Sequence, residues 1–245
     1  MMSWICIEEH YRPHRGLKAA NPSSAPSGWG CTLSFVPNQP PIPRPTIKRL
    51  SHYLRALDSY LGQGRSTISS RQLGQAIGIT DAQVRKDLGN FGQLGQPGIG
   101  YSVPALRAEL RRILKIDRIW NAVVVGVGNI GRAILSYPHF ADRGFNVVAA
   151  FDADASQVGE SIEGIEIRPM EDLSTVITEL DVRIGILTVP ADAAQSVAEE
   201  MTSVGIQGIL NFAPVRLNVG DVAEVTSVDL SRSLEQLAYQ VAVAD

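Results

Sequence analysis

Residues 120–131, Trp-Asn-Ala-Val-Val-Val-Gly-Val-Gly-Asn-Ile-Gly, decide the fold of the larger part of this chain. The apolar run 122–125 is typical of a buried parallel strand, because β-branched side chains suit a pleat that is covered on both faces. Three glycines then follow at the spacing G-x-G-x-x-G. In this pattern the first glycine makes a tight turn, the second lets a pyrophosphate approach the backbone, and the third lets the next helix pack closely. We therefore expect a dinucleotide-binding loop formed by Gly126, Val127, Gly128, Asn129, Ile130 and Gly131.

The segment 119–228 continues as an alternation of strands and helices. Such an alternation predicts a doubly wound parallel sheet of the Rossmann type with helices on both faces. We expect further strands at 146–151, 165–167, 183–189, 208–212 and 224–228, and helices at 129–137, 171–179 and 191–203.

The acidic residue at the end of the second strand indicates which dinucleotide is bound. Asp152 lies 21 residues after Gly131, where a carboxylate can accept hydrogen bonds from the hydroxyls of an adenine ribose. The same carboxylate would repel a 2′-phosphate, and Asp154 adds to that repulsion. No Arg or Lys occurs between Asp152 and Glu166. The pattern therefore favours NAD⁺ and NADH over their phosphorylated forms.

Two strand ends in the second half of the sheet are candidates for the nicotinamide side, because they open into the same crevice as the glycine loop. An alternative for the prolines is simple termination of a strand, which is their commoner use. The candidate residues are Thr188, Pro190, Asn211 and Pro214.

Charge divides the chain. Residues 44–118 carry 13 Lys and Arg against 5 Asp and Glu, whereas residues 119–245 carry 6 against 18. A basic half joined to an acidic half suggests that the first half meets a polyanion, although a basic surface can also be only a solvated one.

Two short capped helices in the basic half predict a helix-turn-helix. A first helix from about residue 45 carries the apolar stripe Ile47, Leu50, Leu54, Leu57 and Leu61. Capping-box patterns then begin at Ser69 and at Thr80, on either side of a Gly78 turn. In a helix-turn-helix the second helix, here about 81–90, enters the major groove of DNA.

The glycine-rich stretch 91–101 suits a β-hairpin wing beside this recognition helix. We expect the recognition helix to present Gln83, Arg85, Lys86 and Asn90 to DNA. A small helical bundle that binds protein is the alternative, with the two basic residues as solvated charges. The full set of expected DNA contacts is Ser70, Arg71, Gln83, Arg85, Lys86, Asn90 and Gln93.

The remaining segments complete the domain plan. Residues 1–43, which hold both cysteines, have the composition of a disordered tail; the alternative is a start site assigned too far upstream. Residues 44–118 end in a connecting helix from Pro104. Residues 229–245 form an apolar-striped helix that covers its own domain or crosses to a second subunit. No apolar run of roughly 18 residues and no signal peptide is evident, so we expect a cytoplasmic protein.

The sequence lacks the usual equipment of a dehydrogenase, which needs a general acid or base near the nicotinamide. The four histidines lie at 10, 14, 52 and 139, and no Lys follows Lys115. A Tyr or Asp could still take that role, but the usual catalytic residues are missing, so we expect cofactor binding without catalysis. The competing hypotheses are an NAD-dependent oxidoreductase with an added domain and a module that binds coenzyme A or another nucleotide.

Several motifs in one order resemble the Rex family of redox-sensing transcriptional repressors. They cover about 200 residues and are Tyr53-Leu-Arg55, 83–88, Phe91-Gly92, 98–101 with Val103-Pro104, 126–131, 151–154, 187–190 and 208–214. The resemblance implies a homodimer that binds palindromic operator DNA when NADH is scarce and releases it when NADH binds.

The resemblance also implies a domain-swapped C-terminal helix. By position, Arg55, Tyr137 and Asp229 match residues that couple the NAD(H) state to the orientation of the DNA-binding domains. An Arg–carboxylate pair suits that role, because it is strong in one geometry and lost after rotation. The alternatives are a phosphate contact or solvated charge for Arg55, a core aromatic for Tyr137 and a helix N-cap for Asp229.

The chain departs from the family at three places. The wing tip is Gln96-Pro97 where a basic residue is frequent, and Ala155-Ser-Gln157 replaces a Pro-x-Lys pattern. Leu230 stands where an aromatic can follow the aspartate.

Overall fold

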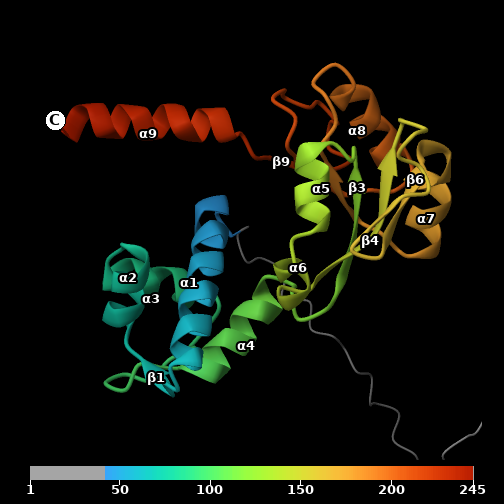
Figure 1. Ribbon diagram of the computed structural model, residues 1–245. Coiled ribbons are helices and arrows are strands. Elements are labelled where there is room, and N and C mark those ends of the chain that lie inside the picture. Colours follow the sequence, from blue (N-terminus) through green and yellow to red (C-terminus); the bar gives the residue numbers. More distant parts are fainter. Residues whose placement is uncertain (1–41, 245) are drawn as a thin grey trace, which may run out of the picture. The chain divides into compact units, whose positions relative to one another are not determined.

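The computed structural model describes residues 42–244 (Figure 1). The predicted tail therefore lies outside the described residues except for its last two positions, and so do both cysteines. No helix among the described residues is long and apolar enough to cross a membrane.

The basic half folds as a winged helix-turn-helix. Its elements are α1 (Arg44–Gly62), β1 (Thr67–Ile68), α2 (Ser70–Ile77), α3 (Asp81–Gly89), β2 (Tyr101–Ser102) and α4 (Val103–Ile113). Leu50, Leu54 and Leu57 of the predicted α1 stripe are buried, and they pack with residues of α2, α3 and α4 into one core. The predicted stripe was too long at both ends, because Ile47 and Leu61 are at least a third exposed and lie outside the buried part.

The caps of the two short helices differ. Ser69 forms a complete capping box with Gln72, as predicted. Thr80 accepts a hydrogen bond from the backbone N–H of Gln83, which begins α3. The side chain of Gln83 donates elsewhere, to Asp87, so the second capping box is only half formed.

The wing is simpler than the predicted hairpin. Strand β2 pairs antiparallel with β1, which precedes α2, and not with a strand inside 91–101. Within that stretch a single bridge joins Gln96 to Gly100. Gly98 and Gly100 have positive φ angles, so glycines allow the loop to turn back without a longer ladder.

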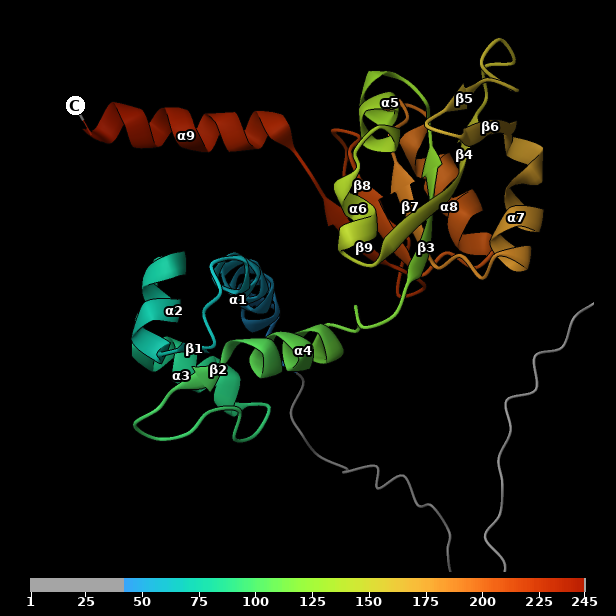
Figure 2. The ribbon, with the colours of Figure 1, turned by 60° about the horizontal axis from the view of Figure 1, so that its bottom comes forward.

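The acidic half contains one seven-stranded sheet of order β5-β6-β4-β3-β7-β8-β9, parallel except for the β5 edge (Figure 2). Its strands are β3 (Trp120–Val125), β4 (Phe145–Asp152), β5 (Ser161–Ile162), β6 (Ile165–Pro169), β7 (Ile184–Leu187), β8 (Gly208–Asn211) and β9 (Glu224–Ser227). The predicted parallel sheet is confirmed, and the short antiparallel β5 is an addition to the prediction.

Alternate residues of β3 enter two cores, as expected for a strand covered on both faces. Val123 and Val125 pack with α7 (Leu173–Glu179) and α8 (Ala194–Ser203). Val124 packs with α5 (Asn129–Leu135) and the region of α6 (His139–Asp142). The strand order reverses beside β3, and the carboxyl ends of β3, β4, β7 and β8 lie along one edge of the sheet.

The chain closes with α9 (Leu230–Ala244). Residues 42–244 do not cover its predicted apolar stripe: Leu230, Leu234, Leu237 and Val241 are each more than half exposed.

Candidate DNA-binding surface and dinucleotide site

The outward side of α3 carries two cations. Arg85 and Lys86 are both exposed, as predicted. Arg85 donates to Asp81 one turn earlier at 2.7 Å and to Ser70 Oγ at 3.1 Å, so it ties the starts of α2 and α3 together. Because the arginine is held while its guanidinium remains exposed, it can present further N–H groups to an anion.

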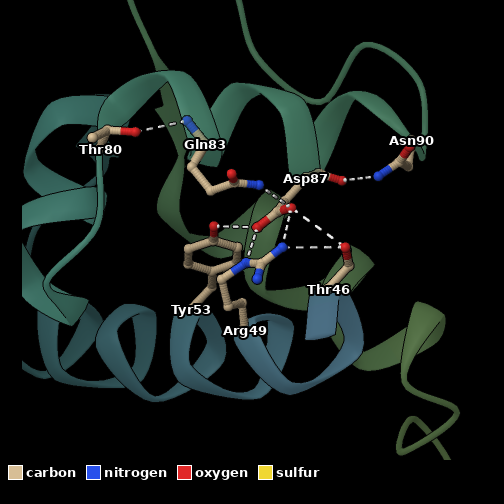
Figure 3. A network of polar contacts seen from close by, with 7 residues as sticks. All are labelled: Thr46, Arg49, Tyr53, Thr80, Gln83, Asp87 and Asn90. Carbon is tan, nitrogen blue, oxygen red and sulfur yellow. Dashed lines mark hydrogen bonds and ion pairs between the residues drawn. The ribbon is translucent and has the colours of Figure 1, made fainter. Parts of the chain in front are cut away.

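Gln83 was predicted to point outward, but its side chain is half-buried. Its side-chain amide donates to Asp87 at 2.8 Å, on the side of α3 that faces α1 (Figure 3). Asp87 itself was missed, although a signal exists in the sequence. It lies three residues after Val84 and next to Leu88, at the spacing of the buried face, where an acid needs partners from another element.

The other predicted DNA contacts lie around α3. Arg71 and Gln93 are exposed, and Ser70 is half-buried at the start of α2. Asn90 donates to the Asp87 carbonyl and so caps the end of α3. A groove of about 550 Å³ lies between α2, α3 and the wing. It is lined by Ser69, Ser70, Arg85, Leu88, Gly89 and residues 92–101.

The glycine loop has the geometry that its spacing predicts. Gly126 adopts a φ of 95°, and a Cβ there would lie 2.8 Å from the Thr188 backbone. A Cβ on Gly131 would lie 2.1 Å from the Gly126 carbonyl oxygen, so only glycine lets α5 approach the loop. A Cβ on Gly128 would meet no atom within 4 Å. The loop is therefore tight where it packs and open beside Gly128, as a pyrophosphate site requires.

Asp152 lies at the end of β4 beside this loop. Its carboxylate accepts hydrogen bonds from the backbone N–H groups of Val127 at 2.5 Å and Asp154 at 2.9 Å. Asp154 in turn accepts from the hydroxyl and backbone of Ser156, which lowers the pKa of Asp154. Both carboxylates are thus held in place, and the half-buried Asp152 keeps lone pairs for a ligand.

The two predicted polar residues on the other strands support the backbone of the crevice. Thr188 donates to the carbonyl oxygen of Gly126, and Asn211 is fully buried. Asn211 donates to the Val215 carbonyl and accepts from the backbone N–H of Ala213. Thr188 therefore anchors the glycine loop, and Asn211 shapes the turn that follows β8. Pro190 and Pro214 are exposed beside these strand ends.

No hydrogen bond or ion pair joins the three expected coupling residues to one another within residues 42–244. Arg55 is exposed on α1. Tyr137 follows α5, half exposed, with edge-on ring contacts to His139 and Phe140, so it is not a core aromatic. Asp229 accepts a hydrogen bond from the backbone N–H of Arg232 and so caps α9. The N-cap role of Asp229 is thus present, while the coupling role stays a prediction.

Fold and site together define a class of protein, namely a DNA-binding regulator in which a winged helix precedes a dinucleotide-binding sheet. Two family models match: one described as "Putative DNA-binding protein N-terminus" over residues 41–89 and one described as "CoA binding domain" over residues 117–215.

Similar proteins of known family identify the chain more specifically than the two family models do. The "Redox-sensing transcriptional repressor Rex" of Desulforamulus reducens is 45% identical over 83% of this chain and 97% of its own length. That of Carboxydothermus hydrogenoformans is 46% identical over 82% of this chain and 96% of its own. The chain belongs to the Rex family of redox-sensing transcriptional repressors, as the resemblance implied.

Solved structures agree with this assignment. The crystal structure of RSP in complex with β-NAD⁺ and operator DNA matches with a TM-score of 0.79 at 37% identity, over 83% of this chain and 94% of that one. RSP in complex with β-NADH matches with a TM-score of 0.75 at 35% identity, over 83% and 95%.

Proposed function

We propose that this protein represses transcription by binding operator DNA through α3 and the wing, and that NADH bound at the glycine loop releases it. The observation that carries this proposal is the presence, on one chain, of a basic winged helix and a glycine loop that is open at Gly128 and flanked by Asp152. The complexes of RSP with operator DNA, β-NAD⁺ and β-NADH support both ligands.

The dinucleotide is held mainly by backbone groups. Its pyrophosphate lies beside Gly128, where the free N–H groups at the start of α5 meet the phosphates. Asp152 receives the adenine ribose, and the second carboxylate at Asp154 disfavours a 2′-phosphate. The nicotinamide end lies toward the strand ends that carry Thr188, Pro190, Asn211 and Pro214.

The DNA contacts divide into two kinds. Arg85, at the start of the exposed face of α3, is suited to base edges in the major groove, and Lys86 is suited to phosphate. Ser70, Arg71, Asn90 and Gln93 border the same surface and contribute positioning contacts. The departure at the wing tip, Gln96-Pro97, provides no cation for the minor groove.

Coupling between the sites requires two states. NADH must bind the state that cannot hold DNA more tightly than the DNA-bound state, because a ligand with equal affinity for both shifts nothing. In this proposal Arg55, Tyr137 and Asp229 make different contacts in the two states.

The working unit in this proposal is a homodimer. The apolar side of α9 is exposed, and an apolar groove of about 380 Å³ on the sheet is lined by residues that include Phe140, Phe145, Val147 and Leu210. Surfaces of this kind bury themselves against another chain. A swap of α9 between two copies would cover its stripe and match the two-fold symmetry of a palindromic operator.

The protein acts as a sensor in the cytoplasm and not as an enzyme in this proposal. Neither His52 nor His139 lies at the strand ends on the nicotinamide side. Purified protein should therefore transfer no hydride from NADH to small carbonyl acceptors above the buffer rate.

The decisive experiment is an operator gel shift at a constant total concentration of NAD⁺ plus NADH. DNA affinity should fall as the NADH fraction rises. An operator affinity that stays constant across the titration would contradict the proposal. A thermal-shift comparison of NADH, NAD⁺, NADPH and coenzyme A tests the nucleotide, because only a ligand of the folded state raises the melting temperature. If coenzyme A alone raised the melting temperature, coenzyme A and not NADH would be the ligand of the glycine loop.

A further inference from the structure

The winged helix contains a buried carboxylate that neither the glycine loop nor the DNA surface uses. Asp87 lies on α3 and is 1% exposed. It is the only buried Asp or Glu among residues 42–244. A charge in such a position is costly unless hydrogen bonds replace the lost water, so its partners reveal what it does.

Four side chains donate to this carboxylate, three of them from α1 (Figure 3). Arg49 donates through Nε to Oδ2 at 2.5 Å and through Nη2 to Oδ1 at 2.8 Å. The Tyr53 hydroxyl donates to Oδ2 at 2.8 Å, and the Thr46 hydroxyl donates to Oδ1 at 3.4 Å. The fourth donor is the Gln83 amide, one turn earlier on α3, at 2.8 Å from Oδ1. Each carboxylate oxygen is thus used at least twice.

The charge states in this cluster are fixed. Burial acts to raise the pKa of Asp87, but the hydrogen bonds from Arg49, Tyr53 and Gln83 outweigh it and leave that pKa below its usual value. Burial raises the pKa of the Tyr53 hydroxyl far above its usual range, and the bond to Asp87 adds to the shift. Tyr53 is therefore a donor, and Asp87 an acceptor, at neutral pH.

The arrangement fixes how α3 is rotated about its own axis. Arg49 and Tyr53 are one turn apart on α1, and Gln83 and Asp87 are one turn apart on α3. The contact therefore extends over one turn of each helix. A two-point Arg–carboxylate contact also has a preferred plane, which apolar packing lacks. With 3.6 residues per turn, Arg85 lies roughly 160° around α3 from Asp87. Holding Asp87 inward therefore holds Arg85 outward.

We propose that Asp87 is the positioning residue of the DNA-reading surface: it sets the rotation of α3 and withdraws the Gln83 side chain from DNA, so that Arg85 and Lys86 read the operator. This inference rests on the proposed function. It makes Gln83 a support for α3, in place of the base contact that its position in the sequence suggested.

The apolar core explains why the cluster is not needed for adhesion alone. Val84 and Leu88 of α3 are buried against Leu50 and other residues of the same core. Those contacts hold the helices together, but the hydrophobic effect itself is not directional and so specifies the rotation of α3 less sharply than hydrogen bonds do. A buried polar cluster that is fully satisfied selects one arrangement among those that the apolar contacts permit.

The test compares Asp87→Asn with Glu109→Gln, using full-length protein, operator DNA and random DNA of equal length. In Asp87→Asn the new side chain would aim an amide N–H₂ group at donors of Arg49 and Tyr53. Removing a negative charge alone would favour DNA binding, so a loss of affinity has another cause. Glu109, which pairs with Arg112 on α4, controls for loss of an ion-paired acid in the same domain.

We expect Asp87→Asn to lower operator affinity about tenfold or more while random-DNA and NADH affinities change less than about twofold. Tyr53→Phe, which removes one donor, should lower operator affinity about threefold. Glu109→Gln should leave the ratio of operator to random affinity unchanged. Gln83→Ala should leave the base preference at every operator position unchanged.

An Asp87→Asn variant that melts at lower temperature but keeps the wild-type ratio of operator to random affinity would overturn the proposal, since Asp87 would then only stabilise. If Asp87→Asn does not fold, an unchanged ratio in Tyr53→Phe overturns it instead. Loss of preference at a single base pair in Gln83→Ala would show that Gln83 reads DNA. Wild-type protein that does not prefer operator over random DNA would contradict the proposed function itself.

Discussion

Helix α3 of the winged helix and the glycine loop of the sheet are held in place by opposite means. Helix α3 is fixed by side chains that converge on Asp87 from α1, across 34 to 41 residues of sequence. The glycine loop is fixed by backbone atoms and by the absence of side chains, as at Gly131, where no Cβ fits. The position of α3 depends on side chains that are present, whereas the shape of the glycine loop depends on positions that lack a side chain.

This difference predicts different responses to substitution. A change in the cluster around Asp87 removes a partner and leaves a buried polar group unsatisfied, which costs about 1–3 kcal/mol. A change in the glycine loop adds atoms to a space that the backbone already fills. The first should affect the orientation of α3, and the second should affect packing or the ligand, depending on which glycine is changed.

The largest effect should follow from Gly131→Ala. The new Cβ would lie 2.1 Å from the Gly126 carbonyl oxygen, which belongs to the backbone and cannot move aside easily. We expect the sheet domain to lose about 3 kcal/mol of stability, measured by denaturant unfolding, together with NADH binding. Gly128→Ala is the matched control, because its Cβ meets no atom within 4 Å. It should weaken NADH binding with little change in stability, and equal destabilisation by both variants would break the comparison.

A smaller effect is expected from Asp152→Ala. Loss of the ribose contact should weaken NADH binding ten- to hundredfold, or about 1.5–3 kcal/mol, as measured by calorimetry. Operator affinity without cofactor should stay intact, because Asp152 belongs to the sheet domain. Asp152→Asn keeps one oxygen for the Val127 N–H and so separates support of the loop from ribose binding. Equal losses of DNA and NADH affinity in Asp152→Ala would mean that the residue is structural.

The smallest effect is expected when the pH is lowered and Asp87 becomes protonated. The pKa of Asp87 is lowered in the folded protein, so its ionised form contributes stability above the unfolded value of about 3.9. That contribution is lost as pH falls below about 4 and passes through the folded pKa. Hydrogen exchange of α1 and α3 amides should show the advantage of wild type over Asp87→Asn shrinking in this window. An advantage that stays constant down to about pH 2 would mean that Asp87 is not ionised in the fold.

Local patterns predicted the parts that are encoded within one turn or one loop. The glycine spacing predicted the close packing at Gly126 and Gly131 and the open space beside Gly128, because these features depend mainly on local backbone geometry. The capping box at Ser69 formed as expected for the same reason. The order of strands and helices from β3 onward followed from alternating apolar patterns, which report the two covered faces of a parallel sheet.

Errors arose where distant elements decide the outcome. The stripe of α1 was extended to Ile47 and Leu61, whose exposure depends on how far its neighbours reach. The wing was expected as a hairpin within 91–101, whereas β2 pairs with β1 from the other side of α2 and α3. The Gln83 side chain was expected on the outward face of α3, but its amide donates to Asp87.

The sequence by itself determined the family, the fold class, the geometry of the glycine loop and the place of Asp152 beside it, because these depend on spacing along the chain. The tertiary structure alone decided that the Gln83 side chain turns toward Asp87 and away from the outward face of α3. That choice depends on a carboxylate meeting Arg49 and Tyr53, 38 and 34 residues away, and only packing brings them within hydrogen-bond distance.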